Sequence, residues 1–488
     1  MRLGVTVDGI AYHALTRPEA VAVIHDGRRV SYADFYRDIR RFLRGLRELG
    51  LSPGDSAAVG CADFYTHWLL LLAFEQLGVA TASLAPREDP SSASRLFASV
   101  DLVIGEIGLP AGAVPLKRHE PITPAWIERV LGLDPEAVEP RIPHSPDDAI
   151  RITRTSGTTG ASKRMLLRRR AHEARLARWI CFGIERGHRY LVSMPFTMHA
   201  VYSVATVYVR AGATVVHDTK RELGDALLAY EIDHVILMPK QLRHVLDRLP
   251  AEAPRPRNLV VSSLGATLPA PLRERALARI ATAVLDMYAC NEVGLVALAG
   301  LDGAGPAALW PGVTVEIVDD RGNSLPPGEA GNIRIATDAM VEGYLDDAET
   351  TARMFRDGWF YPGDIGILRG ARRLQVLGRA DELLNVGGEK ISPANVEELI
   401  MAEAAIEDVG VCTIPDAQGV EQLCVAVSGE VATDPRALER LGRLLGPVRV
   451  GSVFVVGVSR IPRTPTGKIQ RALLKTVALD ALTQARAI

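Results

Sequence analysis

The sequence predicts an α/β fold, because short apolar segments of strand length alternate with segments of helical period along most of the chain. Apolar residues recur at helical spacing over residues 31–49 and stop at Gly50, and a second apolar helix over residues 67–77 stops at Gly78. Strands separated by helices pair in parallel and are covered on both faces. Parallel sheets between layers of helices are therefore expected.

The expected buried strands share continuous runs of apolar residues. They are Val21–His25, Ser56–Gly60, Leu102–Ile104, Tyr190–Ser193, Thr214–His217, His234–Leu237 and Leu259–Ser262. After Pro311 the expected strands follow one another closely between Gly/Pro turns, which predicts a smaller β-rich unit. These strands are Val313–Asp319, Gly331–Ala336, Ile365–Leu368 and Leu374–Gly378.

A domain boundary is expected just after Gly378, where charged residues precede a loop with two glycines. Beyond it, helices and strands of ordinary length alternate again, which predicts a compact C-terminal module of about a hundred residues. Its expected helices are Pro393–Ala402 and Pro435–Leu445, and its expected strands are Val409–Ile414, Leu423–Ser428 and Gly451–Val458.

Length and composition indicate a globular protein of several domains. At 488 residues the chain is too long for one ordinary core, and a net charge of −2 gives no bulk attraction for nucleic acid. The charged N-terminal segment is unlike a signal peptide, and the apolar run Trp68–Phe74 is too short to span a bilayer. The five cysteines lack CxxC spacing and are interpreted as reduced thiols. We therefore expect a cytoplasmic protein with neither nucleic-acid nor membrane partners.

Residues 155–163 read Thr-Ser-Gly-Thr-Thr-Gly-Ala-Ser-Lys and are the most informative stretch of the chain. Gly157 and Gly160 allow tight turns, so that several backbone N–H groups can converge on an anion. Hydroxyl and ammonium donors suit a polyphosphate, although such a run on its own is more often a flexible turn. The donors are Ser156, Thr158, Thr159 and Lys163.

A basic run follows this loop. Residues 163–178 contain seven Lys or Arg residues against one acid, Glu173. The run is interpreted either as a solvated helix face or as a docking surface for an acidic partner such as a carrier protein.

Five further motifs follow this loop along the sequence. They are Tyr-Ala-Cys-Asn-Glu over 288–292, Trp-Phe-Tyr-Pro-Gly-Asp over 359–364, Gly-Arg-Ala-Asp over 378–381, Leu-Asn-Val-Gly-Gly-Glu-Lys over 384–390 and Pro-Arg-Thr-Pro-Thr-Gly-Lys over 462–468. In this order the chain, from about His13 to Arg471, resembles the adenylate-forming superfamily of acyl-CoA synthetases, nonribosomal-peptide adenylation domains and luciferases. The resemblance implies a large N-terminal domain of stacked parallel sheets with a small β-rich subdomain (1–380). It also implies a smaller, mobile C-terminal α+β lid domain (381–488).

The resemblance also implies the reaction and its cofactors, ATP, Mg²⁺ and CoA. A carboxylate attacks the α-phosphate of ATP, pyrophosphate leaves, and the acyl group passes to the thiol of CoA, giving a thioester. Both reactants of the first step are anions, so positive charge is needed where they meet. The implied nucleotide contacts are Thr155, Ser156, Gly157, Thr158, Thr159, Gly160 and Lys163 at the phosphates, Gly265, Ala266 and Tyr288 at the base, Asn291 beside Glu292, Asp364 at the ribose, and Arg379 at the ribose or a phosphate.

Four residues carry the implied chemistry. Lys468 would bridge the attacking carboxylate and the α-phosphate, because its ammonium sits on a flexible stem after Gly467. Glu292, with Thr159, would hold Mg²⁺. Asp381 lies at the implied hinge. The chain departs from the superfamily pattern at Ser162, Ala289 and Asn291, so a non-catalytic nucleotide-binding relative is one alternative.

The acyl pocket is expected to be mainly apolar. The position that pairs an α-amino group in peptide synthetases is His199 here, which disfavours an α-amino acid and favours an aryl or a short to medium aliphatic acid. The pocket residues are Met198, His199, Tyr202, Leu264, Leu295 and Val296.

The thiol tunnel is implied at Gly387, Gly388 and Lys390, which favours CoA. The same loop serves carrier-protein phosphopantetheine, so loading of an acyl carrier protein or another nucleophile stays open as an alternative. The sequence does not fix the oligomeric state; a homodimer is one option.

Overall fold

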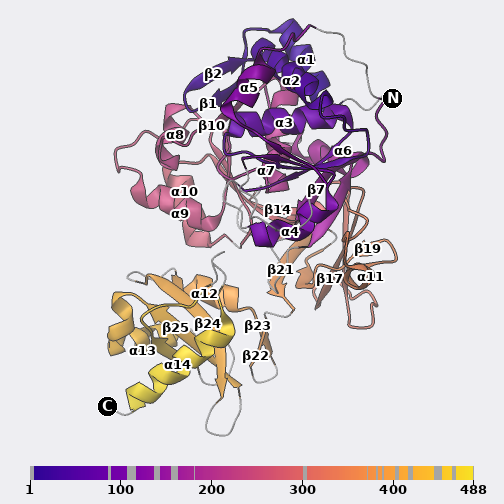
Figure 1. The fold of residues 1–488 in the computed structure, drawn as a ribbon. Helices are drawn as coiled ribbons and strands as arrows, with labels where there is room; N and C mark the ends of the chain where they lie inside the picture. Colours follow the sequence, from indigo (N-terminus) through magenta and orange to yellow (C-terminus); the bar gives the residue numbers. More distant parts are fainter. Residues whose placement is uncertain are drawn as a thin grey trace. The chain divides into compact units, whose positions relative to one another are not determined.

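The computed structural model describes residues 5–85, 90–106, 117–136, 143–154, 163–180, 182–266, 268–300, 305–370, 372–380, 383–386, 389–401, 406–415, 421–444, 453–463 and 469–486. The chain forms two compact units (Figure 1). The first comprises residues 1–268, 272–315 and 334–361, and the second comprises 269–271, 316–333 and 362–488.

One sheet of the first unit has the strand order β6-β5-β3-β4-β7-β8. Its pairs are parallel except for the antiparallel hairpin β7–β8. The strands are β3 (Ser56–Gly60), β4 (Ala80–Ser83), β5 (Leu102–Gly105), β6 (His119–Pro121), β7 (Ala149–Arg154) and β8 (Arg164–Arg168).

A second sheet runs in the order β2-β1-β10-β9-β11-β12-β13-β14-β15 within the first unit. The run from β1 to β13 is parallel, and β2, β14 and β15 pair antiparallel at its ends. The strands are β1 (Val21–His25), β2 (Arg28–Ser31), β9 (Arg189–Leu191), β10 (Thr214–His217), β11 (His234–Leu237), β12 (Val260–Ser263), β13 (Ala283–Cys290), β14 (Gly294–Ala299) and β15 (Ala307–Leu309).

A layer of helices separates these two sheets, because α6 (Arg169–Ile180) contacts β7 and β8 of one sheet and β14 of the other. It also contains α3 (Phe64–Leu77), which packs on β3 and β4, and α7 (His199–Ala211), which packs on β9 and β10 (Figure 1). Helix α3 is mostly apolar, and all of its residues except Gln76 are buried. The Asp63 side chain caps α3 at the Thr66 N–H (2.7 Å), and Gly78 ends it with φ +70°.

The remaining elements of the first unit cover the outer faces. The helices are α1 (Thr6–Thr16), α2 (Tyr32–Arg47), α4 (Pro90–Ser99), α5 (Pro124–Leu131), α8 (Leu223–Ala229), α9 (Pro239–Arg248) and α11 (Ala348–Met354), with short strands β18 (Phe355–Arg356) and β19 (Trp359–Phe360). Helix α10 (Ala270–Arg279) and strands β16 (Val313–Val318) and β17 (Ala330–Thr337) run from one unit into the other. In the region that the structure describes, no helix is long and apolar enough to cross a membrane.

The second unit contains the antiparallel pair β20 (Asp364–Leu368) and β21 (Arg373–Arg379), the hairpin β22 (Leu384–Val386) and β23 (Glu389–Ile391), and the sheet β24-β25-β26. Side chains alternate across β24 and β25: Val411 and Val425 join one core cluster, while Cys412 and Cys424 join another. The elements are β24 (Asp408–Pro415), β25 (Glu421–Ser428), β26 (Val453–Gly457), α12 (Pro393–Met401), η1 (Glu430–Thr433), α13 (Pro435–Leu444) and α14 (Arg471–Arg486).

The observed architecture confirms the predicted α/β class with stacked, parallel-rich sheets. The predicted boundary at 380/381 stays a prediction. The compact second unit takes in residues 362–380 and 316–333 as well as the C-terminal segment.

Candidate active site

The first unit brings Glu292 and Lys163 to one place through a tyrosine. Glu292 lies in the turn between β13 and β14, and its carboxylate Oε1 accepts a 2.8 Å hydrogen bond from the hydroxyl of Tyr344. Lys163 Nζ lies 5.0 Å from the centre of the same tyrosine ring. A predicted metal ligand and a predicted phosphate ligand are therefore close neighbours.

The backbone of Glu292 is fixed from two sides. Its carbonyl accepts hydrogen bonds from the Val341 N–H (2.9 Å) and from Nη2 of Arg175 in α6 (3.1 Å). The residue is buried, and no described residue donates a hydrogen bond to its other carboxylate oxygen, Oε2. A carboxylate oxygen to which no described residue donates suits a hard cation such as Mg²⁺, so this residue fits the implied metal.

Asn291 explains one departure from the superfamily motif. Its Nδ2 donates a 2.9 Å hydrogen bond to the carbonyl of Arg154, the last residue of β7. Residues 155–162 follow directly, so Asn291 anchors the start of the predicted phosphate loop. The loop residues Thr155, Ser156, Gly157, Thr158, Thr159 and Gly160 lie outside the described residues.

The predicted adenine contacts follow β12 and lie on β13. Gly265 and Ala266 are exposed directly after the end of β12, and Leu264 beside them is buried. Tyr288 is half-buried on β13, in register with Ala297 of β14. The contact of these residues with a base stays a prediction.

The predicted ribose ligands pair in the second unit. Asp364 of β20 and Arg379 of β21 are register partners, with Arg379 Nη1 lying 3.6 Å from Asp364 Oδ1. Nη1 also donates to the carbonyl of Pro362. Gly363 has φ +80°, and a Cβ there would stand 3.2 Å from Nη2 of Arg379. Glycine is therefore required for the arginine to lie against this turn.

We expect Asp364→Asn to weaken ATP binding by about 10- to 100-fold, because a charged acceptor contributes roughly 1.5–3 kcal/mol to such hydrogen bonds. The KM for ATP measured in pyrophosphate exchange checks this, with 3′-deoxy-ATP as the companion substrate. If the wild type does not distinguish ATP from its deoxy analogues, the ribose role is wrong.

Both ends of the Lys468 loop belong to the second unit, although Lys468 itself lies outside the described residues, as do Asp381, Gly387 and Gly388. Arg463 and Ile469 form an antiparallel bridge on either side of the loop. Arg463 also makes two hydrogen bonds to the Asp408 carboxylate, at 2.8 and 2.6 Å. Arg463 thus joins one end of the loop to β24, and the bridge holds Ile469 at the other end beside it. Lys390 lies on β23 in register with Asn385, across the hairpin that carries the two glycines.

Most of the basic run after the phosphate loop is buried rather than solvated, since Arg164, Arg169, Arg175 and Arg178 are each at most 8% exposed. Its interpretation as a docking surface stays a prediction. Arg175 donates to the Ala339 carbonyl at 3.0 Å, and Arg178 donates to the Leu295 carbonyl at 2.7 Å. The other arginines pair with this unit's own acids. The pairs are Arg164–Asp346, Arg168–Glu342, Arg169–Glu75 and Arg170–Glu342. Their charge binds α6 and β8 to the rest of the unit.

One other group of side chains in the described residues could hold a metal ion. His25 and His217, register partners at the ends of β1 and β10, lie with Asp26 so that one ligand atom of each is within 4.8 Å of the others. Hydrogen bonds already join these side chains: His25 Nε2 lies 2.8 Å from Asp63, and the two Nδ1 atoms lie 3.2 Å apart. The His25 side chain thus has protein partners at both ring nitrogens.

The sequence model of the AMP-binding enzyme family matches residues 10–345 of this chain. The chain belongs to the AMP-binding enzyme family. This AMP-binding enzyme is 28% identical over 496 residues to a feruloyl-CoA synthase from an Amycolatopsis species, with 93% of this chain and 94% of the relative covered. It is 26% identical to the fatty acid–[acyl-carrier-protein] ligase ScoC of Streptomyces coeruleorubidus, covering 97% and 96% of the two chains.

Solved structures agree with the fold of this AMP-binding enzyme. The O-succinylbenzoate-CoA synthetase MenE of Bacillus subtilis, in complex with ATP and magnesium, superposes with a TM-score of 0.81 at 20% identity. That match covers 96% of this chain and 99% of MenE. ATP-bound MatB of Rhodopseudomonas palustris gives a TM-score of 0.80 at 22% identity, covering 96% and 98% of the two chains. The resemblance predicted from the motifs is confirmed.

Sequence reasoning missed Tyr344, which joins the predicted metal and phosphate ligands of this AMP-binding enzyme. The Gly-Tyr pair at 343–344 was the available signal. We expect Tyr344→Phe to raise the Mg²⁺ concentration needed for half-maximal pyrophosphate exchange by about tenfold, because groups that orient a metal ligand contribute on this scale. The phenylalanine ring retains the contact with Lys163, so an unchanged Mg²⁺ dependence would show that the hydroxyl does not orient Glu292.

Proposed function

We propose that this AMP-binding enzyme is an AMP-forming acid–thiol ligase. In the first step an oxygen of the substrate carboxylate attacks the α-phosphate of ATP, the bond to the β-phosphate oxygen breaks, and pyrophosphate leaves. In the second step the thiol sulfur of CoA attacks the acyl carbon, AMP leaves, and the thiol proton passes to solvent. The names of the relatives support this assignment, since feruloyl-CoA synthase and 2-succinylbenzoate–CoA ligase both join an acid to CoA.

The proposal rests mainly on the contact of Tyr344 with Lys163 and Glu292, at the C-terminal end of the predicted phosphate loop. Lys163 adds positive charge for the phosphates, and Glu292 offers a free carboxylate oxygen to Mg²⁺. When bound there, Mg²⁺ would neutralise developing phosphate charge. Asp364 and Arg379 would hold the ribose.

We further propose that residues 381–488 act as the mobile lid and deliver Lys468, with Asp381 at the hinge. The paired ends of the Lys468 loop support this role, because a loop whose ends are bridged to each other and joined to β24 through Arg463 would move with that sheet. The thiol would enter past Gly387, Gly388 and Lys390. The substrate would be a small carboxylic acid in the pocket around His199 and Tyr202.

Product analysis by mass spectrometry tests the acceptor. With ATP, Mg²⁺, CoA and a panel of acids, we expect an acyl-CoA thioester and one AMP for each turnover. The relationship to ScoC favours a second candidate, loading of a carrier protein. A thioester that forms on a holo-carrier protein and never on free CoA would replace the first candidate with the second. Acyl-AMP without any thioester would contradict both.

A further inference from the structure

A cluster of buried polar side chains without partners lies in the central helical layer of the first unit. It consists of Arg151 on β7, His172 on α6 and His199 on α7. All three are at most 4% exposed. Buried polar groups normally have hydrogen-bond partners, so this cluster requires an explanation.

Arg151 is the charged member of the cluster. Its Nη2 donates to Ser83 Oγ (2.8 Å) and to the Phe196 carbonyl (3.2 Å), while Nε and Nη1 have no partner. The guanidinium lies 4.1 Å from the centre of the Tyr202 ring. No carboxylate of the described residues forms an ion pair with it. A buried guanidinium is ordinarily paired with a carboxylate, and an aromatic ring is a weaker substitute.

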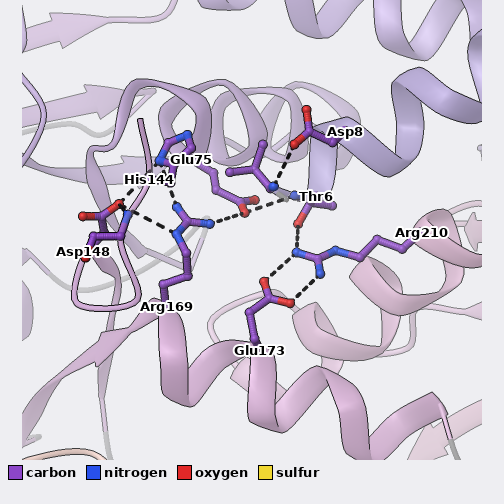
Figure 2. Close-up of polar contacts among 10 residues, drawn as sticks. Thr6, Asp8, Glu75, His144, Asp148, Arg169, Glu173 and Arg210 are labelled. Atoms are coloured by element: carbon purple, nitrogen blue, oxygen red, sulfur yellow. Dashed lines mark hydrogen bonds and ion pairs between the residues drawn. The ribbon is translucent and has the colours of Figure 1, made fainter. Parts of the chain in front are cut away.

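The glutamates of this layer pair with other arginines, as Figure 2 shows. Glu75 Oε1 accepts from the Thr6 N–H (3.2 Å) and lies 3.5 Å from Arg169 Nη1. Glu173 makes two hydrogen bonds with Arg210, at 2.7 and 2.9 Å. The network therefore pairs Arg169 with Glu75 and Asp148 and pairs Arg210 with Glu173, and none of these carboxylates forms an ion pair with Arg151.

The two histidines add hydrogen-bond donors to the cluster, and they carry no negative charge that could pair with Arg151. Their ring centres lie 5.4 Å apart, and none of their four nitrogens has a hydrogen-bond partner. Burial, together with neighbouring arginines, holds both imidazole pKa values well below the usual range, so both rings are neutral at pH 7. Each neutral ring offers one N–H donor. Taken together, the cluster is built to receive an anionic acceptor.

The cluster lies next to the predicted adenylation site. Arg151 lies on β7 three residues before Arg154, the last described residue ahead of the predicted phosphate loop, which corresponds to about 10 Å along the strand. His172 lies one helical turn before Arg175, whose guanidinium holds the Glu292 carbonyl. Through β7 and α6 the cluster therefore adjoins the residues that precede the predicted phosphate loop and that hold Glu292.

We propose that Arg151, with His172 and His199, binds a second carboxylate on the acyl substrate, so that the acid activated is a dicarboxylic acid. This inference rests on the proposed adenylating function and specifies its substrate class. Arg151 would pair with the distal carboxylate, while the other carboxylate reacts with ATP. A monocarboxylic acid of the same length would leave the guanidinium buried and unpaired, and sites of this kind reject the analogue that lacks the polar group.

Acid-dependent ATP–pyrophosphate exchange with matched acids tests the proposal. The pairs are glutarate with pentanoate, adipate with hexanoate, and phthalate with benzoate. For the wild type we expect kcat/KM for the best diacid to exceed that of its matched monoacid by at least about 100-fold. In Arg151→Met this preference should fall at least about 30-fold, and in His199→Gln it should fall less.

Arg210→Met is the matched control, because it removes a buried arginine that is already paired with Glu173. It should lower the melting temperature and keep the diacid preference. Calorimetric titration of each variant with adipate and hexanoate, in the presence of AMP, gives a readout that does not require turnover. Exchange that is as efficient with monoacids as with diacids would overturn this inference and leave the adenylating function standing. Equal slowing of exchange with diacids and with monoacids in Arg151→Met would also overturn the inference. Exchange with none of the acids would contradict the adenylating function itself.

Discussion

Replacing Lys468 by alanine is expected to lower acyl-adenylate formation by at least about 100-fold while the protein stays folded. Removing one preorganised donor from a developing oxyanion typically costs roughly 3–4 kcal/mol, which corresponds to this factor. The loss should fall on the rate of pyrophosphate exchange, since the lysine contributes where the carboxylate meets the α-phosphate. Circular dichroism and the melting temperature check that the fold is retained.

Lys475→Ala is the matched control for this experiment. Lys475 lies seven residues further on, in α14, and its Nζ pairs with Glu421 at 2.7 Å. Its removal should leave exchange within about twofold of the wild type, because exposed ion pairs contribute little. If Lys468→Ala retains exchange within about threefold of the wild type, Lys468 is not the residue that bridges the reactants.

Glu292→Gln is expected to slow exchange by about 100-fold at millimolar Mg²⁺, with partial recovery as Mg²⁺ rises. The amide keeps the volume of the side chain, and its oxygen still accepts from Tyr344, so the turn between β13 and β14 should survive. The charge that attracts the cation is lost, however, and metal ligation favours carboxylate oxygen. Exchange rates measured over a Mg²⁺ series separate weaker metal binding from a slower reaction.

Glu342→Gln serves as the control for this substitution, since Glu342 is an exposed carboxylate that pairs with Arg168 and Arg170. We expect no change in the Mg²⁺ dependence of this variant. A Glu292→Gln enzyme with wild-type Mg²⁺ dependence would remove Glu292 from the metal site and weaken the proposed architecture of the active site.

The central strands could be predicted from the sequence to the residue or nearly so. Strands β1, β3, β10 and β11 have the predicted bounds, because strands covered on both faces are continuous apolar runs between clear breaks. Helix α14 was not predicted, since its weak amphipathic pattern follows the Lys468 motif without a cap signal. The predicted end of α3 at Gly78 is confirmed, and its start lies three residues before the predicted one.

Less of the candidate site could be predicted from the sequence. Motifs identified Glu292, Asp364 and Arg379, but the residue that bonds the Glu292 carboxylate, Tyr344, lies outside every motif. The burial of Arg175 and Arg178 could not be predicted, because charge favours solvent unless carbonyls from elsewhere in the fold receive it. Those carbonyls belong to residues more than 100 positions away. Helical spacing carries no information about such contacts.

Acid-dependent formation of acyl-AMP, measured by ATP–pyrophosphate exchange without CoA, tests the central claim most directly. The claim is that Lys468, Glu292 and the predicted phosphate loop together activate a carboxylic acid. We predict exchange that requires both an acid and Mg²⁺, that falls by about 100-fold or more in Lys468→Ala and in Glu292→Gln at millimolar Mg²⁺, and that persists in Lys475→Ala. An enzyme that binds ATP but shows no acid-dependent exchange, or whose exchange survives both substitutions, would contradict the account.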